Sequence, residues 1–327
     1  MRNSVHFAMT DDGASLPVID ITNAAFAVEK SEAELAAMAD QFLIESAQQR
    51  ELTPALREAM QHSTLGRGLM AAAGSFLDGM STYRLKLGPD NLWAGASSID
   101  RSIAGSFPAF TSRLRLQDMA RLIAEGLSVT VAAEPRRKVI LINIGGGTGS
   151  DSWNALIHLR AQQLSPLAGR EIVIAVLDSD CSGPGFGSRA VEALRTEDAP
   201  LNGIDISFRH YKYDWSNIEE LQAKLRLLNA EDAACSISSE GGLFEYGSDA
   251  EIRSNLKALH SGTASDAQIS GSVTRDGGPM HASQAASFIR SRPRTLEEFT
   301  SLAEEAGWTV QRAIERPFSF HVSLAKL

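Results

Sequence analysis

A glycine-rich turn follows the apolar segment 139–144 and leads into a helical pattern. Gly145, Gly147 and Gly149 give this turn the form G-x-G-x-G. Glycine permits the positive φ of a tight strand-to-helix turn, and without a Cβ it lets a ligand approach the backbone. A dinucleotide-binding turn usually has the form G-x-G-x-x-G, and a serine takes the third place in both possible frames here. The turn therefore predicts a ligand site, although its match to nicotinamide or flavin binding is imperfect.

Acidic and aromatic residues stand at or beyond the ends of three later apolar segments. In open α/β sheets ligands bind beyond the carboxyl ends of the strands, so we expect these residues to share the site of the glycine turn. A carboxylate can accept hydrogen bonds from two hydroxyl groups at once, and an indole can pack against a flat ring. The residues concerned are Asp178, Asp180, Asp214, Trp215, Glu240, Glu245, Tyr246 and Asp249.

Short apolar strands alternate with helical patterns from residue 138 to the end of the chain. This order predicts an α/β fold with a Rossmann-like, seven-stranded, mostly parallel sheet and helices on both faces. The continuous apolar character of the first two strands fits burial on both faces. The last two strands are expected to form an antiparallel hairpin. The predicted strands are 139–144, 171–178, 204–214, 233–239, 267–274, 308–316 and 318–327.

The first part of the chain has a helical pattern from Ser31 to about Met70. Ser31 is followed by Glu34, which is the spacing of a capping box at a helix start. A second helix is expected to begin near Pro54, because proline is favoured at the first position of a helix.

The segment 80–107 is predicted as a loop, because Gly88-Pro89 and Gly95 interrupt it. A further helix is expected at about 112–125. We therefore expect residues 1–133 to form an N-terminal helical cap and substrate region, and residues 134–327 to form the Rossmann-like domain. Tyr83 lies in the predicted loop, which is expected to fold over the bound cofactor or substrate, with a dimer contact as the alternative.

Residues 143–149 resemble motif I of the class I S-adenosylmethionine-dependent methyltransferases, and the likeness to the small-molecule type extends over about residues 134–327. The motif is a strand that ends in an acid followed by G-x-G-x-G, and Asn143 stands where the family usually has Asp or Glu. The resemblance implies S-adenosylmethionine as the cofactor, ribose contacts from Asp178 with Asp180 as second choice, and adenine contacts from Asp214 and Trp215. The implied cofactor-binding residues are Asn143, Gly145, Gly147, Gly149, Asp178, Asp180, Asp214 and Trp215.

The reaction that this resemblance implies is in-line transfer of a methyl group to a small molecule, in which positioning can supply much of the catalysis. An acceptor hydroxyl or protonated amine must lose a proton to a base. Glu240 is the first candidate for a base or substrate ligand, followed by His281 and Tyr246. The acidic loop favours an amine or amino-acid-like acceptor. The predicted substrate contacts are Tyr83, Glu245 and Asp249.

Three other functions fit the same features. One is transfer of the aminobutyrate arm of S-adenosylmethionine, as in nicotianamine-synthase-like enzymes. Another is a nicotinamide-dependent oxidoreductase on a similar fold. A third is a non-catalytic binding protein in which the cofactor site has decayed, an alternative that the departure at Asn143 keeps open.

Composition narrows the partners of the chain. It has 327 residues, a formal net charge of -9 and two cysteines, so neither a nucleic-acid partner nor a disulfide framework is expected. No two histidines have the spacing of metal ligands, and no metal is predicted. No stretch is apolar enough to span a membrane, and the polar first residues lack the apolar core of a signal peptide, which together predict a cytoplasmic location. A homodimer is a further expectation.

Overall fold

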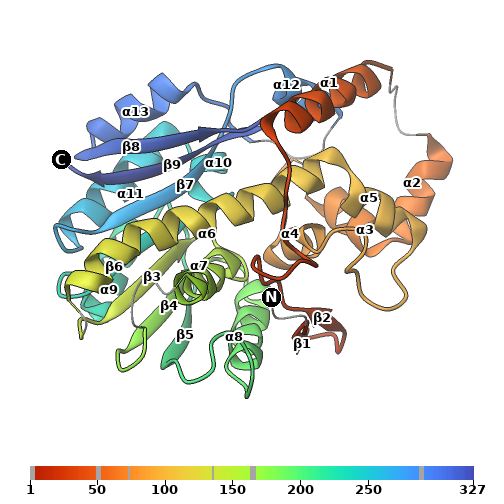
Figure 1. The fold of residues 1–327 in the computed structure, drawn as a ribbon. Helices are drawn as coiled ribbons and strands as arrows, with labels where there is room; N and C mark the ends of the chain where they lie inside the picture. Colours follow the sequence, from red (N-terminus) through yellow and green to blue (C-terminus); the bar gives the residue numbers. More distant parts are fainter. Residues whose placement is uncertain (1–3, 49–52, 73, 135, 163–166, 287–290) are drawn as a thin grey trace.

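The computed structural model describes residues 4–48, 53–72, 74–134, 136–162, 167–286 and 291–327 (Figure 1). Among these residues, seven strands form one sheet in the order β5-β4-β3-β6-β7-β9-β8, and a small hairpin stands apart from it. Strands β3 to β7 run parallel, while β9 lies antiparallel between β7 and β8. The strands of the sheet are β3 (Val139–Ile144), β4 (Ile172–Leu177), β5 (Ile206–Tyr211), β6 (Ala234–Ser239), β7 (Gln268–Thr274), β8 (Trp308–Glu315) and β9 (Ser319–Lys326).

Helices cover both faces of this sheet, as predicted. Alternate residues of β3 and β4 point to opposite faces, so each strand contributes to two separate apolar cores. One core contains residues of α6, α7 and α8, and the other contains residues of α9, α10, α11 and α13. The helices are α6 (Phe107–Ala133), α7 (Ser150–Ala161), α8 (Ser182–Leu194), α9 (Ile218–Leu228), α10 (Leu243–Tyr246), α11 (Asp249–Ser261), α12 (Gly278–Ala286) and α13 (Leu296–Glu304).

The N-terminal region is helical, and the predicted capping box is confirmed. The backbone N–H of Ser31 donates to Glu34 at 2.8 Å, and the backbone N–H of Glu34 donates to the Ser31 hydroxyl at 3.3 Å. Pro54 opens the second helix as expected. The elements of this region are β1 (Phe7–Met9), β2 (Ser15–Pro17), α1 (Glu32–Gln48), α2 (Pro54–Gln61), α3 (Thr64–Ala71), α4 (Gly79–Lys86) and α5 (Ser98–Gly105).

The prediction of a loop over 80–107 is wrong, because the segment contains α4 and α5. Asp78 caps α4 by accepting a hydrogen bond from the backbone N–H of Ser81 at 2.8 Å. Ser97 and Asp100 form a capping box at the start of α5. These local caps begin helices on either side of the glycines that indicated a loop. The helix predicted at about 112–125 is also longer than expected, since α6 begins at Phe107 and ends at Ala133.

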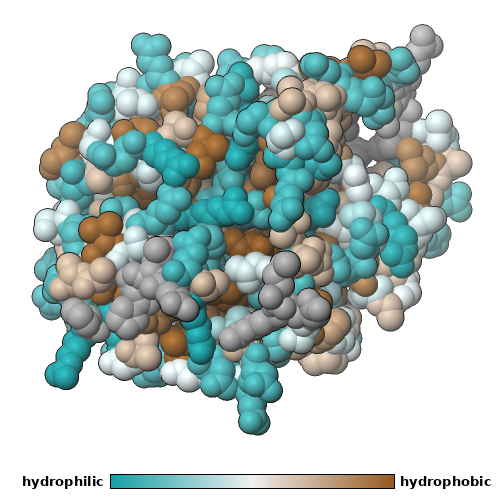
Figure 2. Space-filling view, viewed as in Figure 1, coloured by the Kyte–Doolittle hydropathy of each residue, from teal (hydrophilic) through white to brown (hydrophobic). Residues whose placement is uncertain are grey.

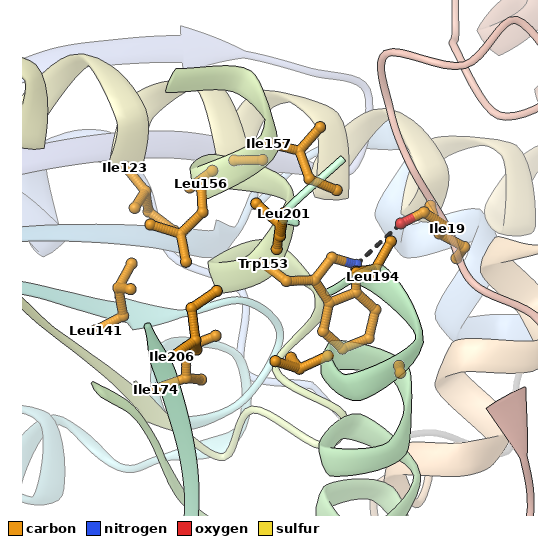
Figure 3. Packing of buried hydrophobic residues seen from close by; sticks show 14 of the residues in the cluster. Ile19, Ile123, Leu141, Trp153, Leu156, Ile157, Ile174, Leu194, Leu201 and Ile206 are labelled. Carbon is orange, nitrogen blue, oxygen red and sulfur yellow. Dashed lines mark hydrogen bonds between the residues drawn. The ribbon is translucent and has the colours of Figure 1, made fainter. Parts of the chain in front are cut away.

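The N-terminal segment and the sheet share one core. Leu16, Val18 and Ile19 belong to the same apolar cluster as the strands β3 and β4. Trp153 of α7 is fully buried in this cluster, and its indole N–H donates to the carbonyl oxygen of Ile19 at 2.9 Å (Figure 3). Helix α6 adds a row of apolar side chains to the same cluster, from Leu116 to Val131. The packing therefore does not divide between residues 133 and 134.

The surface seen from the side of α6 is mainly hydrophilic, with hydrophobic residues in small separate groups (Figure 2). None of the helices in the described part of the chain combines the length and the apolar composition needed to cross a membrane.

Candidate active site

The glycine turn connects β3 to α7 through three left-handed residues. Gly145, Gly147 and Gly149 have φ values of +62°, +54° and +71°. Residues with a side chain rarely adopt such angles, so the turn depends on glycine at these positions. Gly149 also lies against the sheet, because a methyl group there would come within 3.0 Å of the Val176 side chain. Its role in the turn is thus to let α7 pack onto β4.

Three glycines from distant parts of the chain meet at the front of this turn. A methyl group on Gly79, the first residue of α4, would lie 2.7 Å from the Cα of Gly147. A methyl group on Gly183, in the first turn of α8, would lie 2.9 Å from the carbonyl carbon of Gly147. The backbones of α4, the turn and α8 are therefore packed too closely for any side chain, which fixes α4 over the glycine turn.

Replacing Gly183 with alanine is expected to lower the free energy of unfolding by about 1–3 kcal/mol, because the added methyl group overpacks the contact with Gly147. Gly185 on the same helix provides the matched control, since a methyl group there would meet nothing closer than the Asp11 carboxylate at 3.8 Å. Gly185→Ala should be neutral or stabilising by up to about 1 kcal/mol. Denaturant unfolding of both variants measures the difference, and equal stabilities would contradict the close packing.

A cavity of about 350 Å³ lies between the glycine turn and α4. Its walls come from the carboxyl ends of β3, β4, β5 and β6 on one side and from α4 with the residues before it on the other. It brings together nine of the residues predicted for the site. These are Tyr83, Gly145, Gly147, Asp178, Asp180, Asp214, Trp215, Glu240 and Tyr246.

Asp178 lies at the end of β4 and faces the cavity with a partly satisfied carboxylate. One oxygen accepts the backbone N–H of Gly147 at 2.8 Å, and the other accepts the backbone N–H of Asp180 at 2.9 Å. Burial raises the pKa of Asp178, and these two hydrogen bonds offset part of the rise. Because a carboxylate has about four lone-pair positions, each oxygen keeps the capacity to accept one more hydrogen bond from a ligand.

Asp180 and Asp214 line the cavity but also stabilise their own local turns. Asp180 accepts hydrogen bonds from the backbone N–H groups of Ser182 and Gly183 at 3.1 and 3.2 Å, and so stabilises the first turn of α8. Asp214 accepts the backbone N–H of Ser216 at 2.9 Å. This hydrogen bond is the main reason why the pKa of Asp214 lies below its ordinary value.

Glu240 follows β6 and is held by two cations from the N-terminal region. Its Oε2 accepts from Lys86 Nζ at 2.6 Å, and its Oε1 accepts from Arg115 Nε at 3.1 Å. Arg115 continues the network to Glu245 at 3.1 Å. The side chains of Lys86 and Glu240 are 5% and 4% exposed, so this pair is buried. The network joins α4 and α6 to the loop after β6, where the cavity ends.

Tyr246 contributes both an aromatic ring and a hydroxyl to the cavity. Burial, followed by the charge of Glu245, raises its pKa well above the ordinary value, so the hydroxyl stays protonated at neutral pH. Its ring lies 5.8 Å from that of Phe76, which in turn lies 6.0 Å from the ring of Trp215. Phe76 is 44% exposed. The three rings, which we call the aromatic rim, therefore mark the side on which the cavity meets the surface.

The remaining predicted residues lie elsewhere or are engaged by other groups. The Tyr83 hydroxyl donates to the carbonyl oxygen of Pro17 at 2.7 Å and accepts the backbone N–H of Ile19 at 3.0 Å. Asp249 pairs with Arg294 at the start of α11 and does not line the cavity. His281 is exposed on α12 and pairs with Asp276 at 2.6 Å. Glu245 reaches the site only through Arg115 and Tyr246, and Asn143 lies beneath the glycine turn.

Several cavity residues escaped prediction because they lie in the segment expected to be a loop or, like Gly79, directly before it. Gly79, Thr82 and Lys86 all line the cavity from α4. Their spacing of three and then four residues places them on one face of a helix. A correct helical prediction for this segment would therefore have grouped them. Arg115 and Phe76 offered no such signal, since their partners lie more than a hundred residues away.

Comparison with known proteins supports the fold. No family model and no curated protein matches the chain. The structure of a possible exported protein from Bordetella parapertussis is similar, with a TM-score of 0.57, 17% identity, and coverage of 91% of this chain and 97% of that chain. Two further similar structures are the pyocyanin biosynthetic protein PhzM, with a TM-score of 0.43, 19% identity and coverage of 91% and 74%, and the mitomycin 7-O-methyltransferase MmcR, with 0.42, 14%, 87% and 75%.

The likeness to the Bordetella protein extends over nearly the whole of both chains and shows a shared fold. The seven-stranded, mostly parallel sheet with an antiparallel last pair is the one that the alternation of strands and helices predicted. The Rossmann-like α/β fold is thereby confirmed for this chain.

Proposed function

We propose that the protein transfers the methyl group of S-adenosylmethionine to a small molecule bound beside Glu240. The charge of the cavity carries this proposal. Among the described residues, its lining contains six acidic side chains and one basic side chain, Lys86, which is itself paired with Glu240. S-adenosylmethionine brings a sulfonium and an ammonium group against a single carboxylate, so its net positive charge suits this lining. The acidic residues are Asp78, Asp178, Asp180, Asp214, Glu240 and Glu251.

The same lining argues against a nicotinamide dinucleotide. Its pyrophosphate would stand over the glycine turn, where Asp178 already accepts the N–H of Gly147. That N–H group is one that a phosphate would need, because phosphates at such turns are held by backbone donors and a helix N-terminus. Like-charge contacts between a pyrophosphate and the nearby carboxylates would add a further cost. A nicotinamide-dependent oxidoreductase is therefore the less favoured function for this site.

The cofactor positions follow from the polar groups that remain available. In this proposal Asp178 accepts from the ribose hydroxyls, and Asp214 accepts from the adenine amino group while Trp215 packs against the ring. The amino-acid end of the cofactor lies against the backbone of Gly145 and Gly147, which have no side chain. The cavity of about 350 Å³ lies within the range of small-molecule sites.

The acceptor is proposed to enter at the aromatic rim and to end beside Glu240. A flat amine fits this place, because rings can pack against Phe76 and Tyr246 and carboxylates attract an amine. Lys86 and Arg115 hold the two oxygens of Glu240 in fixed positions. A carboxylate held in this way can orient the acceptor. Tyr246 keeps its proton, which its hydroxyl shares in a hydrogen bond with Glu245. The lone pair of the neutral amine nitrogen forms the new bond to the methyl carbon, and the carbon–sulfur bond breaks with its electron pair left on sulfur. Water then takes up the proton that the methylated nitrogen releases.

Transfer of the aminobutyrate arm would use the same cofactor and the same cavity. The two reactions differ in the atom that the acceptor attacks, and the mass of the product distinguishes them. A binding protein without catalysis would retain the cofactor affinity and give no product at all.

Calorimetry with S-adenosylmethionine, S-adenosylhomocysteine and NAD tests the proposal. We expect micromolar binding of the first two, and a loss of at least about tenfold in Asp178→Ala, because the ribose hydroxyls lose a carboxylate partner. NAD is expected to bind much more weakly. Binding of NAD alone, or of none of the three, would overturn the proposal. If the first two bind, mass spectrometry of reactions with a panel of aromatic amines then identifies the transferred group.

A further inference from the structure

Two buried oxygen atoms beneath the glycine turn lack a hydrogen-bond partner. Asn143 at the end of β3 donates through Nδ2 to Asp151 Oδ1, which also accepts the backbone N–H of Ser152 at 2.7 Å. Asn143 Oδ1 and Asp151 Oδ2 remain without a partner among the described residues, although both side chains are almost completely buried. A buried polar atom without a partner costs free energy, and native proteins contain few of them. These two oxygens therefore point to a bound group.

The position of these oxygens places that group at the floor of the cavity. A methyl group on Gly146 would fall 1.6 Å from Asn143 Oδ1, so this oxygen lies directly against the Cα of Gly146. Gly146 lines the cavity, as do Glu240 and Lys86, the two charged residues whose fields reach Asp151. Asp151 is thus the one acid of this region that stands behind the glycine turn rather than in the cavity wall.

We infer that Asp151, from the first turn of α7, supplies the negative charge that Asn143 cannot supply at the end of β3. Asp151 Oδ2 and Asn143 Oδ1 together accept the hydrogen bonds of one ordered water, which in turn accepts from a ligand ammonium group at the glycine turn. The ligand class is an amino acid or a nucleoside joined to one. This inference rests on the proposed function, in which that ammonium belongs to the amino-acid end of the cofactor.

The electrostatics of Asp151 agree with this assignment. Burial raises its pKa to about 6 and the charge of Glu240 adds to the rise, while a hydrogen bond from Ser238 and the charge of Lys86 offset part of it. Without a ligand, the carboxyl is therefore half protonated near pH 6. An ammonium group favours the ionised form, so its binding should strengthen as the pH rises through about 6 and Asp151 loses its proton.

Two ligands that differ only in the amino-acid arm separate this role from general effects on the cavity. S-adenosylhomocysteine carries the arm, and methylthioadenosine lacks it. Calorimetry on the full chain should show that Asp151→Asn weakens the first by about tenfold or more and leaves the second within about twofold. Asp214→Asn is the contrasting variant, since it acts at the proposed adenine end and should weaken both ligands. The double variant Asn143→Asp with Asp151→Asn should restore the affinity for S-adenosylhomocysteine.

Wild-type protein provides a second readout that needs no variant. The ratio of the two affinities should rise in favour of S-adenosylhomocysteine between pH 5 and about pH 7, because only that ligand carries the ammonium. A ratio that stays constant with pH, or an Asp151→Asn variant that weakens both ligands equally, would overturn the role of Asp151 and leave the proposed function intact. If neither ligand binds the wild-type protein, the proposed function fails and this assignment fails with it.

Discussion

Replacing Trp153 with alanine is expected to lower the free energy of unfolding by about 4 kcal/mol. Trp153 is fully buried on α7, between the sheet and the N-terminal segment (Figure 3). Its ring lies 6.2 Å from that of Tyr83. Its removal leaves a cavity bordered by fixed elements on several sides, which limits relaxation. Urea unfolding followed by circular dichroism measures the change.

Trp153→Phe is the matched control for the size of the ring. It keeps most of the buried volume but removes part of the ring system and the indole N–H that donates to Ile19. The Ile19 carbonyl would still accept from Asn154 Nδ2 at 3.1 Å, so we expect a smaller loss of about 1–2 kcal/mol. A loss below about 1 kcal/mol for Trp153→Ala would contradict the packing described for this core.

Replacing Lys86 with methionine is expected to lower the free energy of unfolding by about 3–5 kcal/mol, because one partner is removed from a buried ion pair. Glu240 would then keep only the Arg115 contact while its Oε2 stays buried. The loss should appear in urea unfolding, and it should shrink when Glu240 is also replaced by leucine, because no unpaired carboxylate then remains at that place.

The pair Lys30–Glu34 provides the control for this second prediction. It joins the same residue types at 2.7 Å, but its side chains are 40% and 50% exposed. Lys30→Met should therefore change the stability by less than about 1 kcal/mol. Similar losses for Lys30→Met and Lys86→Met would show that the buried pair does not fix α4 to the loop after β6.

The sequence was sufficient to predict the sheet. Strongly apolar strands such as 139–144 alternate with amphipathic helices, and that order leaves few topologies for an α/β domain. The glycine turn and the acids at the strand ends were predicted for the same reason, since parallel strands carry their carboxyl ends to one edge. Asp178 and Asp214 reach the cavity because the strand directions alone bring them there.

The cap and its charges could not be predicted in the same way. The prediction of a loop relied on the glycines at 88 and 95 and not on the capping residues Asp78 and Ser97, which determine where α4 and α5 begin. No pattern of local spacing links Lys86 to Glu240, which lies 154 residues further along the chain. Local periodicity also gives no sign of the start of α8, which begins at Ser182 in a glycine-rich stretch. Long-range contacts, rather than local propensity, determine these features.

The core shared by the N-terminal segment and the sheet limits how this protein can be rebuilt. Leu16 and Ile19 fill the same cluster as β3, and α6 continues without a break from the cap into the face of the sheet. A fragment that starts after α6 would expose to water the part of the sheet that α6 and the N-terminal segment cover, and would leave only α7 and α8 on that face. An exchange of specificity must therefore keep the first strands and α6 of the host, and graft only α4 with the residues just before it, which line the cavity.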